Sequence, residues 1–223
     1  MGVTVLKVGG VALGRGGFRL ERHVAPGEAV VVVHGAGDRI GAALAAAGIP
    51  SCFHEGRRVT PPEALPHVRA AFAAANAVLC TAIGGRAVGL LGDDIGLRAD
   101  VVAGLGRVGV LRPYAPAVRA DLVAAGRIPV VAPLARGPLN VNADDAAAAL
   151  AQALGADRLV FVSDVEGVVV DGSVASALGV ADVDDARRRG DLSGGILPKL
   201  EAALAAATAG IETRIGATLV TAA

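Results

Sequence analysis

The chain has 223 residues, of which 53% are apolar and 19% are charged, and its formal net charge is zero. A chain of this length forms one large domain or two small lobes with a substantial core. Zero net charge argues against nucleic acids and anionic membranes as partners, so small metabolites are expected instead. Because no apolar stretch approaches the ~20 residues of a membrane span, we expect a soluble, cytoplasmic protein.

Short β-branched segments alternate along the chain with glycine-rich turns and helical stretches rich in alanine and leucine. This alternation is typical of an α/β protein whose parallel sheet is covered by helices on both faces. We expect strands at residues 3–8, 29–33, 49–53, 87–91, 128–132, 158–162, 212–215 and 218–221. We expect helices at residues 38–47, 60–81, 116–125, 143–154, 183–189 and 196–209. The second helix is expected to begin with Thr60 as N-cap and Glu63 completing a capping box.

Cys52 and Cys80 are isolated and belong to no C-x-x-C or Cys/His spacing. Isolated cysteines of this kind are typical of buried thiols. We therefore expect neither a disulfide nor a metal site, and we assign no metal-ligating residue.

Lysine occurs twice in the chain, at Lys7 and Lys199, and the other 19 basic residues are arginine. Both lysines lie close to a glycine pair. An ammonium group is a compact point charge with three donors, and nearby glycines let backbone N–H groups approach an anion. The pairing predicts two phosphate sites, one near each end of the chain.

A valine-rich strand runs into the turn His34-Gly35-Ala36-Gly37, which opens a helix. This arrangement suits a phosphate group. With Gly41 and Glu55 it also resembles a dinucleotide-binding fingerprint, and a tight turn that binds nothing is a third possibility. We expect His34 to be a hydrogen-bonded residue at the strand end rather than a general base.

Asn140, Asn142, Asp144 and Asp145 stand directly ahead of an alanine-rich helix. Asn142 is the expected N-cap, and the two carboxylates suit the positive end of the helix dipole. Capping leaves Asn140 unexplained. We therefore expect Asn140 to contact a substrate and Asp144 to hold lysine ammonium groups.

Two other segments carry weaker signals. The pair Arg57-Arg58 either supplies an arginine that clamps a substrate carboxylate or is a solvated surface feature. Residues 162–168 and 191–195 either border a nucleotide or form ordinary turns.

In chain order the motifs are Lys-x-Gly-Gly, His-Gly-x-Gly, Gly-x-Arg-Val-Thr, Asn-Val-Asn-Ala-Asp, Ser-Asp-Val-x-Gly and Gly-Gly-x-x-x-Lys. Their combination resembles the amino acid kinase family over almost the whole chain. Arg58-Val59-Thr60 together with residues 140–144 resembles its acetylglutamate kinase branch. The alternatives are a relative acting on carrier-bound aminoadipate or glutamate, a non-catalytic binding or regulatory protein on the same fold, and a dinucleotide-dependent oxidoreductase.

The resemblance implies a three-layer αβα sandwich around a mainly parallel open sheet. In it, residues 1–138 bind the acyl amino acid and form a homodimer, and residues 139–223 bind ATP. The implied reaction transfers a phosphoryl group from ATP, with Mg²⁺, to the side-chain carboxylate of N-acetyl-L-glutamate in arginine biosynthesis. Lys7 and Lys199 are the implied catalytic residues, organised by Asp144. The implied substrate-binding residues are Gly35, Ala36, Gly37, Arg58 and Asn140. The implied ATP-binding residues are Gly9, Gly10, Asp164, Val165, Gly167, Leu192 and Ser193, and backbone N–H groups of Gly9, Gly10, Gly35 and Gly37 are expected to face anions.

The chain departs from the family pattern at several points. Ala36 stands where the family has glycine, and its methyl group is expected to narrow the site or shift the backbone. The segment 11–28 is shorter than expected, which reshapes the substrate lid, and shorter segments at 171–190 and 212–223 remove wall from the adenine side. The N-terminal helix of arginine-inhibited hexameric members is missing, so we expect a homodimer without arginine feedback.

Overall fold

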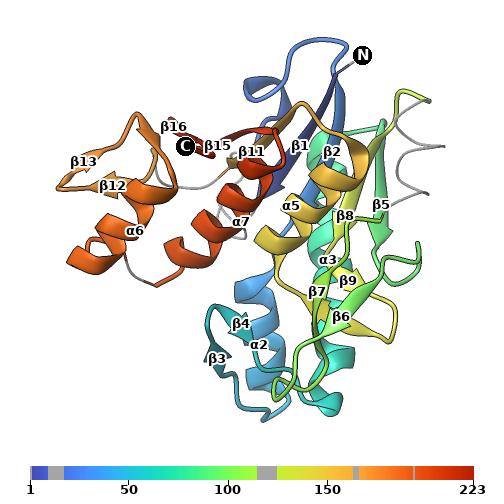
Figure 1. Cartoon of the computed structure of the whole chain (residues 1–223). Coiled ribbons are helices and arrows are strands. Elements are labelled where there is room, and N and C mark those ends of the chain that lie inside the picture. The colour runs from blue at the N-terminus through green and yellow to red at the C-terminus, as the bar shows by residue number, and fades with distance from the viewer. Residues whose placement is uncertain (1, 10–17, 115–124, 163–165, 193) are drawn as a thin grey trace.

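The computed structural model describes residues 2–9, 18–114, 125–162, 166–192 and 194–223. An eight-stranded sheet forms its centre (Figure 1). The strands, in spatial order, are β14 (Ala177–Leu178), β16 (Thr218–Val220), β15 (Glu212–Ile215), β11 (Arg158–Val162), β1 (Val3–Val8), β2 (Ala29–His34), β8 (Ile128–Ala132) and β5 (Ala87–Leu91). Neighbouring strands are parallel except β15 and β16. The expected mainly parallel sheet is confirmed.

Helices and smaller strand groups surround this sheet. The helices are α2 (Gly37–Ala46), α3 (Leu65–Ile83), α5 (Ala143–Leu154), α6 (Val180–Arg189) and α7 (Ile196–Thr208), with 3₁₀ helices η1 (Leu20–Arg22) and η2 (Pro62–Ala64). A four-stranded sheet contains β6 (Ala99–Val101), β7 (Val108–Leu111), β10 (Leu139–Val141) and β9 (Leu134–Ala135). Two hairpins are formed by β3 (Phe53–His54) with β4 (Arg57–Arg58) and by β12 (Val169–Val170) with β13 (Ser173–Val174).

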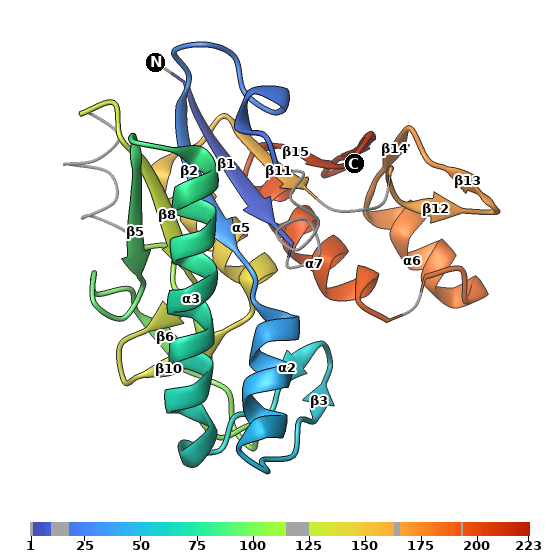
Figure 2. The ribbon, with the colours of Figure 1, turned by 180° about the vertical axis from the view of Figure 1, so that it is seen from behind.

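Side chains along the central strands alternate between the two faces of the sheet, as the two-residue period of a strand requires. Val5 and Val31 belong to a buried cluster with residues of α5 and α7. Leu6 and Val32 belong to a second cluster, which includes Leu79 of α3. Figures 1 and 2 show α5 and α7 on one side of the sheet and α3 on the other. This confirms the three-layer αβα architecture and explains the continuous apolar runs of the central strands.

The start of α3 differs from the expected capping box. Pro61 is extended, with φ −64° and ψ 159°, and a 3₁₀ turn begins at Pro62. The residue before a proline is driven out of the α region, so two consecutive prolines delay the helix. Thr60 instead donates from Oγ1 to Arg58 O at 2.8 Å and accepts from Asn140 Nδ2 at 3.0 Å. The predicted N-cap at Thr60 and the capping box with Glu63 are wrong.

The strand expected at 49–53 is also wrong, because Phe53 alone of these residues is in a strand. Phe53 begins the β3–β4 hairpin, which lies beside α2 at the edge of the molecule (Figure 1). Cys52 is therefore exposed and Cys80 is partly buried, and both thiols are free. The expectation of buried thiols fails for Cys52 because the segment carrying it is a surface hairpin rather than a sheet strand.

The bounds of α2, α5 and α7 agree with expectation to within one residue. Asn142 Oδ1 accepts from Asp144 N at 2.7 Å and from Asp145 N at 3.3 Å, which confirms the predicted N-cap of α5. α6 starts three residues earlier than expected, where Gly179 N donates to Asp182 Oδ2 at 2.9 Å. The helix expected at 116–125 falls almost entirely outside the described residues.

In the described part of the chain, no helix combines the length and apolarity that crossing a bilayer requires. The same residues include no cluster of three or more His, Cys, Asp or Glu side chains placed to hold a metal ion.

Candidate active site

Lys7, Asp144 and Lys199 meet beside the carboxyl end of β1. Lys7 Nζ lies 2.8 Å from Asp144 Oδ1, and Lys199 Nζ lies 3.2 Å from the same oxygen. Lys7 has the same strand parity as Val5 and therefore faces α5, whose first turn carries Asp144. Lys199 projects from the first turn of α7. The three residues that sequence analysis singled out as a group are brought together.

Burial and charge set the ionisation of this group. Burial alone would raise the pKa of Asp144, but the charges and hydrogen bonds of Lys7 and Lys199 outweigh burial and lower it. Burial also lowers the pKa of Lys199, and the Asp144 charge opposes that decrease. Lys199 Nζ lies 5.3 Å from the centre of the Phe161 ring, whose face favours a cation. Two ammonium groups against one carboxylate leave positive charge that suits an anionic ligand.

The glycine turn after β2 leads directly into α2. Gly35 N donates to Val8 O at 3.0 Å, and Gly9 N donates to Val162 O at 3.2 Å. Both N–H groups therefore extend the sheet pairing, and the expectation that they face an anion is wrong in this structure. The first N–H groups of α2, from Gly37 onward, have no acceptor within the helix and form the favourable anion end of its dipole.

Ala36 does not distort this turn. Its φ of −145° is open to any L-residue, and its side chain is buried with Ile40, Leu44 and Phe72. The Ala36 side chain therefore packs in this cluster, and the residue also lines the cavity described below. Its φ lies outside the left-handed region that favours glycine.

Arg58 reaches this turn from the β3–β4 hairpin. Its Nη2 donates to Gly37 O at 3.1 Å, its Nη1 contacts Ser51 Oγ, and its guanidinium lies 4.5 Å from the centre of the Phe53 ring. Burial lowers the pKa of Arg58, but an arginine keeps its charge in proteins. These contacts hold one cationic group at the edge of the cavity.

A cavity of about 190 Å³ joins these parts. Its lining comes from the glycine turn, the hairpin, β10 and the start of α5, and includes Lys7, Gly35, Ala36, Gly37, Phe53, Arg57, Arg58, Asn140, Asn142 and Asp144. Asn140 is buried, and its Nδ2 bond to Thr60 fixes the orientation of its amide. The cavity therefore has lysine charge at one part of its wall and arginine charge at another. Phe53 and Arg57 were not assigned to the site from sequence.

His34 faces the opposite side of the sheet. Its parity matches Val32, so its ring packs toward α3, where Nε2 lies 3.0 Å from Asn76 Nδ2. Nδ1 lies 3.3 Å from Gly35 O, which makes Nδ1 the donor and Nε2 the acceptor. Burial lowers the pKa of His34 to about 4, so the ring is neutral at neutral pH. The expectation of a hydrogen-bonded strand-end histidine is confirmed.

Only some of the residues assigned to ATP binding belong to the part of the chain that the structure describes. Gly10, Asp164, Val165 and Ser193 lie outside the described residues. Leu192 is buried in the main core cluster. A Cβ atom at Gly167 would lie 2.6 Å from Val174 Cγ1 and 2.7 Å from Thr218 Oγ1, so close packing explains the glycine without a ligand.

The dinucleotide hypothesis fails on the position of Glu55. In that fingerprint the ribose-binding acid follows the second strand of the parallel sheet. Here Glu55 lies in the turn of the β3–β4 hairpin, with φ 46°. It does not follow a strand of the central sheet.

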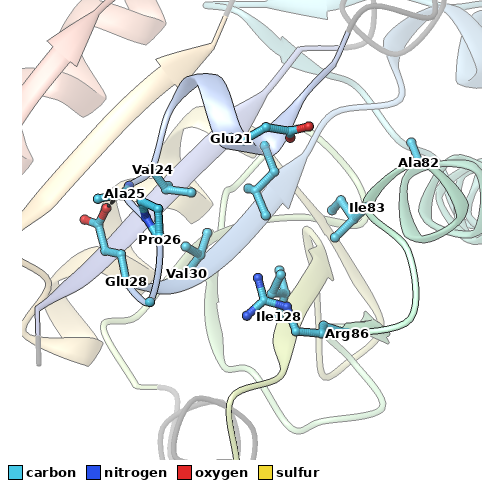
Figure 3. A pocket seen from close by; sticks show the side chains of 12 residues that line it. Glu21, Val24, Ala25, Pro26, Glu28, Val30, Ala82, Ile83, Arg86 and Ile128 are labelled. Atoms are coloured by element: carbon cyan, nitrogen blue, oxygen red, sulfur yellow. Dashed lines mark hydrogen bonds between the residues drawn. The ribbon is translucent and has the colours of Figure 1, made fainter.

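A second cavity, of about 400 Å³, lies at the other end of the sheet (Figure 3). Its lining includes the first residue of β8, Ile128, the last residue of α3, Ile83, and most of the residues from Leu20 to Glu28. Glu28 is held by Ala25 N and Thr4 Oγ1. This cavity is larger, but neither lysine lines it. Lys7 and Asp144 line the smaller cavity, which is therefore the candidate active site.

Comparison with known proteins agrees with this geometry. Residues 2–217 match the sequence model of the amino acid kinase family. The chain belongs to the amino acid kinase family. Among curated amino acid kinases, the acetylglutamate kinase of Rubrobacter xylanophilus is 42% identical, with 96% of this chain and 88% of that protein aligned. The acetylglutamate kinase of Chloroflexus aggregans is also 42% identical, over 79% of this chain and 75% of its own length.

Solved structures share the fold. A protein of Streptococcus mutans UA159 superposes with a TM-score of 0.83 at 26% identity, covering 99% of both chains. Carbamate kinase from Giardia lamblia bound to AMP-PNP superposes with a TM-score of 0.68 at 15% identity, covering 100% of this chain and 99% of its own. At 15% identity the likeness to that kinase shows the fold alone.

Proposed function

We propose that this protein transfers the γ-phosphoryl group of ATP to the side-chain carboxylate of N-acetyl-L-glutamate, giving N-acetylglutamyl phosphate and ADP in arginine biosynthesis. The observation that carries the proposal is the meeting of Lys7 and Lys199 at one oxygen of Asp144. Its substrate follows from 42% identity to an acetylglutamate kinase over 96% of this chain.

The chemistry requires positive charge and positioning rather than a protein base. A carboxylate is already a nucleophile at neutral pH, and its attack on a phosphoryl group is limited by repulsion between anions. Positioned cations stabilise the charge on the transferring and leaving oxygens. Lys7 and Lys199 supply this charge, and Asp144 fixes both ammonium groups. The neutral, buried His34 is not needed for the reaction.

The acyl amino acid is assigned to the 190 Å³ cavity. Arg58 and the Asn140 amide bind its α-carboxylate side, and the backbone of residues 35–37 lies along the substrate. The arginine charge and lysine charge on separate parts of the wall suit a molecule with two carboxylates. In this assignment residues 1–138 form the acyl amino acid lobe and the homodimer contact.

ATP is assigned to residues 139–223, with Gly9, Gly10, Asp164, Val165, Gly167, Leu192 and Ser193 around the nucleotide. The described residues fit a polyphosphate because the lysine group has net positive charge and the N-terminus of α7 lies next to it. Mg²⁺ would supply charge neutralisation on the β- and γ-phosphates, bound mainly by phosphate and water oxygens. A cytoplasmic location is part of the same proposal.

The test is phosphorylation of N-acetylglutamate by the purified protein with MgATP. ADP release and hydroxylamine-trapped acyl phosphate are expected to appear in equal amounts, and the Lys199→Met variant serves as the inactive control. N-acetylaminoadipate and free glutamate in parallel reactions test relatives with other substrates. A folded protein that gives no acyl phosphate with N-acetylglutamate would contradict the proposal.

A further inference from the structure

The neighbouring residues Arg57 and Arg58 point in different directions from β4. Successive side chains of a strand leave opposite faces. Arg58 turns to Gly37 at the start of α2, while Arg57 Nη2 donates to Asp145 Oδ2 in the first turn of α5 at 2.7 Å. The two arginines of one short strand therefore connect the substrate cavity to the helix that carries Asp144.

Gly56 supplies two more contacts between the hairpin and the lysine-bearing elements. Asn142, the N-cap of α5, donates from Nδ2 to Gly56 O at 3.3 Å. Gly56 has φ 72°, and a Cβ atom there would overlap Pro198 Cγ, so the hairpin turn lies directly on the start of α7. Pro198 immediately precedes Lys199. The hairpin thus contacts both helices that hold the catalytic group.

The Arg57–Asp145 pair is the charged part of this connection. The side chains are 23% and 14% exposed, so solvent screens them less than an open surface pair. Burial raises the pKa of Asp145, the Arg57 charge opposes this, and the charges of Asp144 and Glu201 act in the same direction as burial. Arg57 therefore offsets a buried negative charge beside the catalytic carboxylate. Within the described residues Asp145 is its hydrogen-bonding partner, and Arg57 Nε is buried without an acceptor.

Resting on the proposed function, we propose that Arg57 and Asp145 are a positioning pair: their ion pair holds the hairpin that carries Arg58 in register with the Lys7–Asp144–Lys199 group. Arg58 then grips the acyl amino acid at a fixed distance from the lysines. Loss of the pair frees the hairpin while leaving Lys7, Asp144 and Lys199 in place. Binding of N-acetylglutamate is weakened more than binding of ATP.

A double-mutant cycle tests the pair through kinetics. Arg57→Gln and Asp145→Asn are each expected to raise the KM for N-acetylglutamate about tenfold, with the KM for ATP within about twofold. The double variant is expected to be no worse than either single variant, and Arg57→Lys to retain most of the wild-type KM. Arg112→Gln and Asp100→Asn form the control cycle, because that ion pair is more than half exposed and outside the cavity.

Hydrogen exchange of the amides of residues 52–59 provides a readout that does not depend on activity. Exchange is expected to be faster in Arg57→Gln and Asp145→Asn than in the wild type, and unchanged in the Arg112 and Asp100 variants. Unchanged exchange in folded Arg57→Gln, or independent and additive effects of the two substitutions on KM, would overturn the positioning role. A wild-type protein that is inactive toward N-acetylglutamate would instead refute the proposed function. In that case amide hydrogen exchange would still decide whether the Arg57–Asp145 pair holds the hairpin.

Discussion

Lys7 in the central strand β1 and Lys199 in α7 both contact Oδ1 of Asp144, at 2.8 and 3.2 Å. The lysine–glycine pairing alone predicts two phosphate sites, one near each end of the chain, whereas the family resemblance implies one group organised by Asp144. The shared oxygen agrees with the single group and excludes two separate sites. A single carboxylate atom between two ammonium groups fixes their separation and leaves their remaining N–H donors for a ligand.

The first prediction concerns the shape of the lysine charge. Lys7→Arg and Lys199→Arg keep the charge but replace a compact ammonium group with a planar fork. Each is expected to lower kcat about 10²- to 10³-fold with little change in melting temperature. Steady-state kinetics and thermal unfolding of the same preparations provide the measurement. Wild-type kcat in either variant would show that the point charge is not required.

The second prediction concerns proton binding at Lys199. Burial lowers its pKa below the usual 10.5, and the Asp144 charge raises it in part. Removing that charge in Asp144→Asn is expected to lower the Lys199 pKa further. Since the chain contains two lysines, ¹³Cε-lysine labelling gives two side-chain NMR signals whose pH titrations can be followed, and Lys7→Arg assigns them. An unchanged or raised Lys199 pKa in Asp144→Asn would contradict the electrostatic arrangement.

The third prediction concerns Ala36. Ala36 is buried in the core and also lines the 190 Å³ cavity, and its φ is −145°. We expect Ala36→Gly to act mainly through the packing it removes, because the gain in cavity volume is a single methyl group. The variant is expected to lose about 0.5–1 kcal/mol of stability, with the KM for N-acetylglutamate unchanged. Urea unfolding and substrate titration test both parts. A substantially lower KM would show that the methyl group does narrow the substrate site.

The fourth prediction concerns His34 and pH. The folded-state pKa is about 4, below the ordinary value of 6.5. The unfolded chain therefore binds the proton first as pH falls. Stability is expected to decrease between pH 6.5 and 4, with His34 contributing at most about 1.4 kcal/mol per pH unit. Above pH 6.5 His34 contributes no pH dependence.

His34→Gln is the matched variant for this measurement, because it keeps an acceptor for Asn76 but does not titrate. Urea unfolding at pH 4.5, 5.5 and 6.5 is expected to show a smaller pH dependence in the variant than in the wild type. Equal pH dependence in the two proteins would exclude His34 as a source of acid sensitivity.

Much of the fold follows from local sequence pattern. The strand limits of β1, β5, β8, β11 and β15 follow from short apolar or β-branched segments, and the Asn142 cap follows from short-range hydrogen bonding. Both signals are visible in neighbouring residues. The errors occur where longer-range contacts decide. Local pattern predicts Thr60 as a helix cap, but its hydroxyl oxygen instead accepts a hydrogen bond from the amide of Asn140, 80 residues away in the chain. The N–H groups of Gly9 and Gly35 look available in sequence, but they extend pairing between strands.

The sequence by itself determined which groups are present, and its motifs identified Lys7, Asp144 and Lys199 as one group. The faces of Lys7 and His34 depend on the register between β1 and β2, which pairs Lys7 with Val33 and Val8 with His34. Only the tertiary structure decided that both lysines contact Oδ1 of Asp144. It also decided that Arg57 pairs with Asp145 while the neighbouring Arg58 contacts Gly37. These are contacts between elements far apart in the chain. Their geometry depends on how the sheet, α5, α7 and the hairpin pack together, and no local pattern of residues specifies that packing.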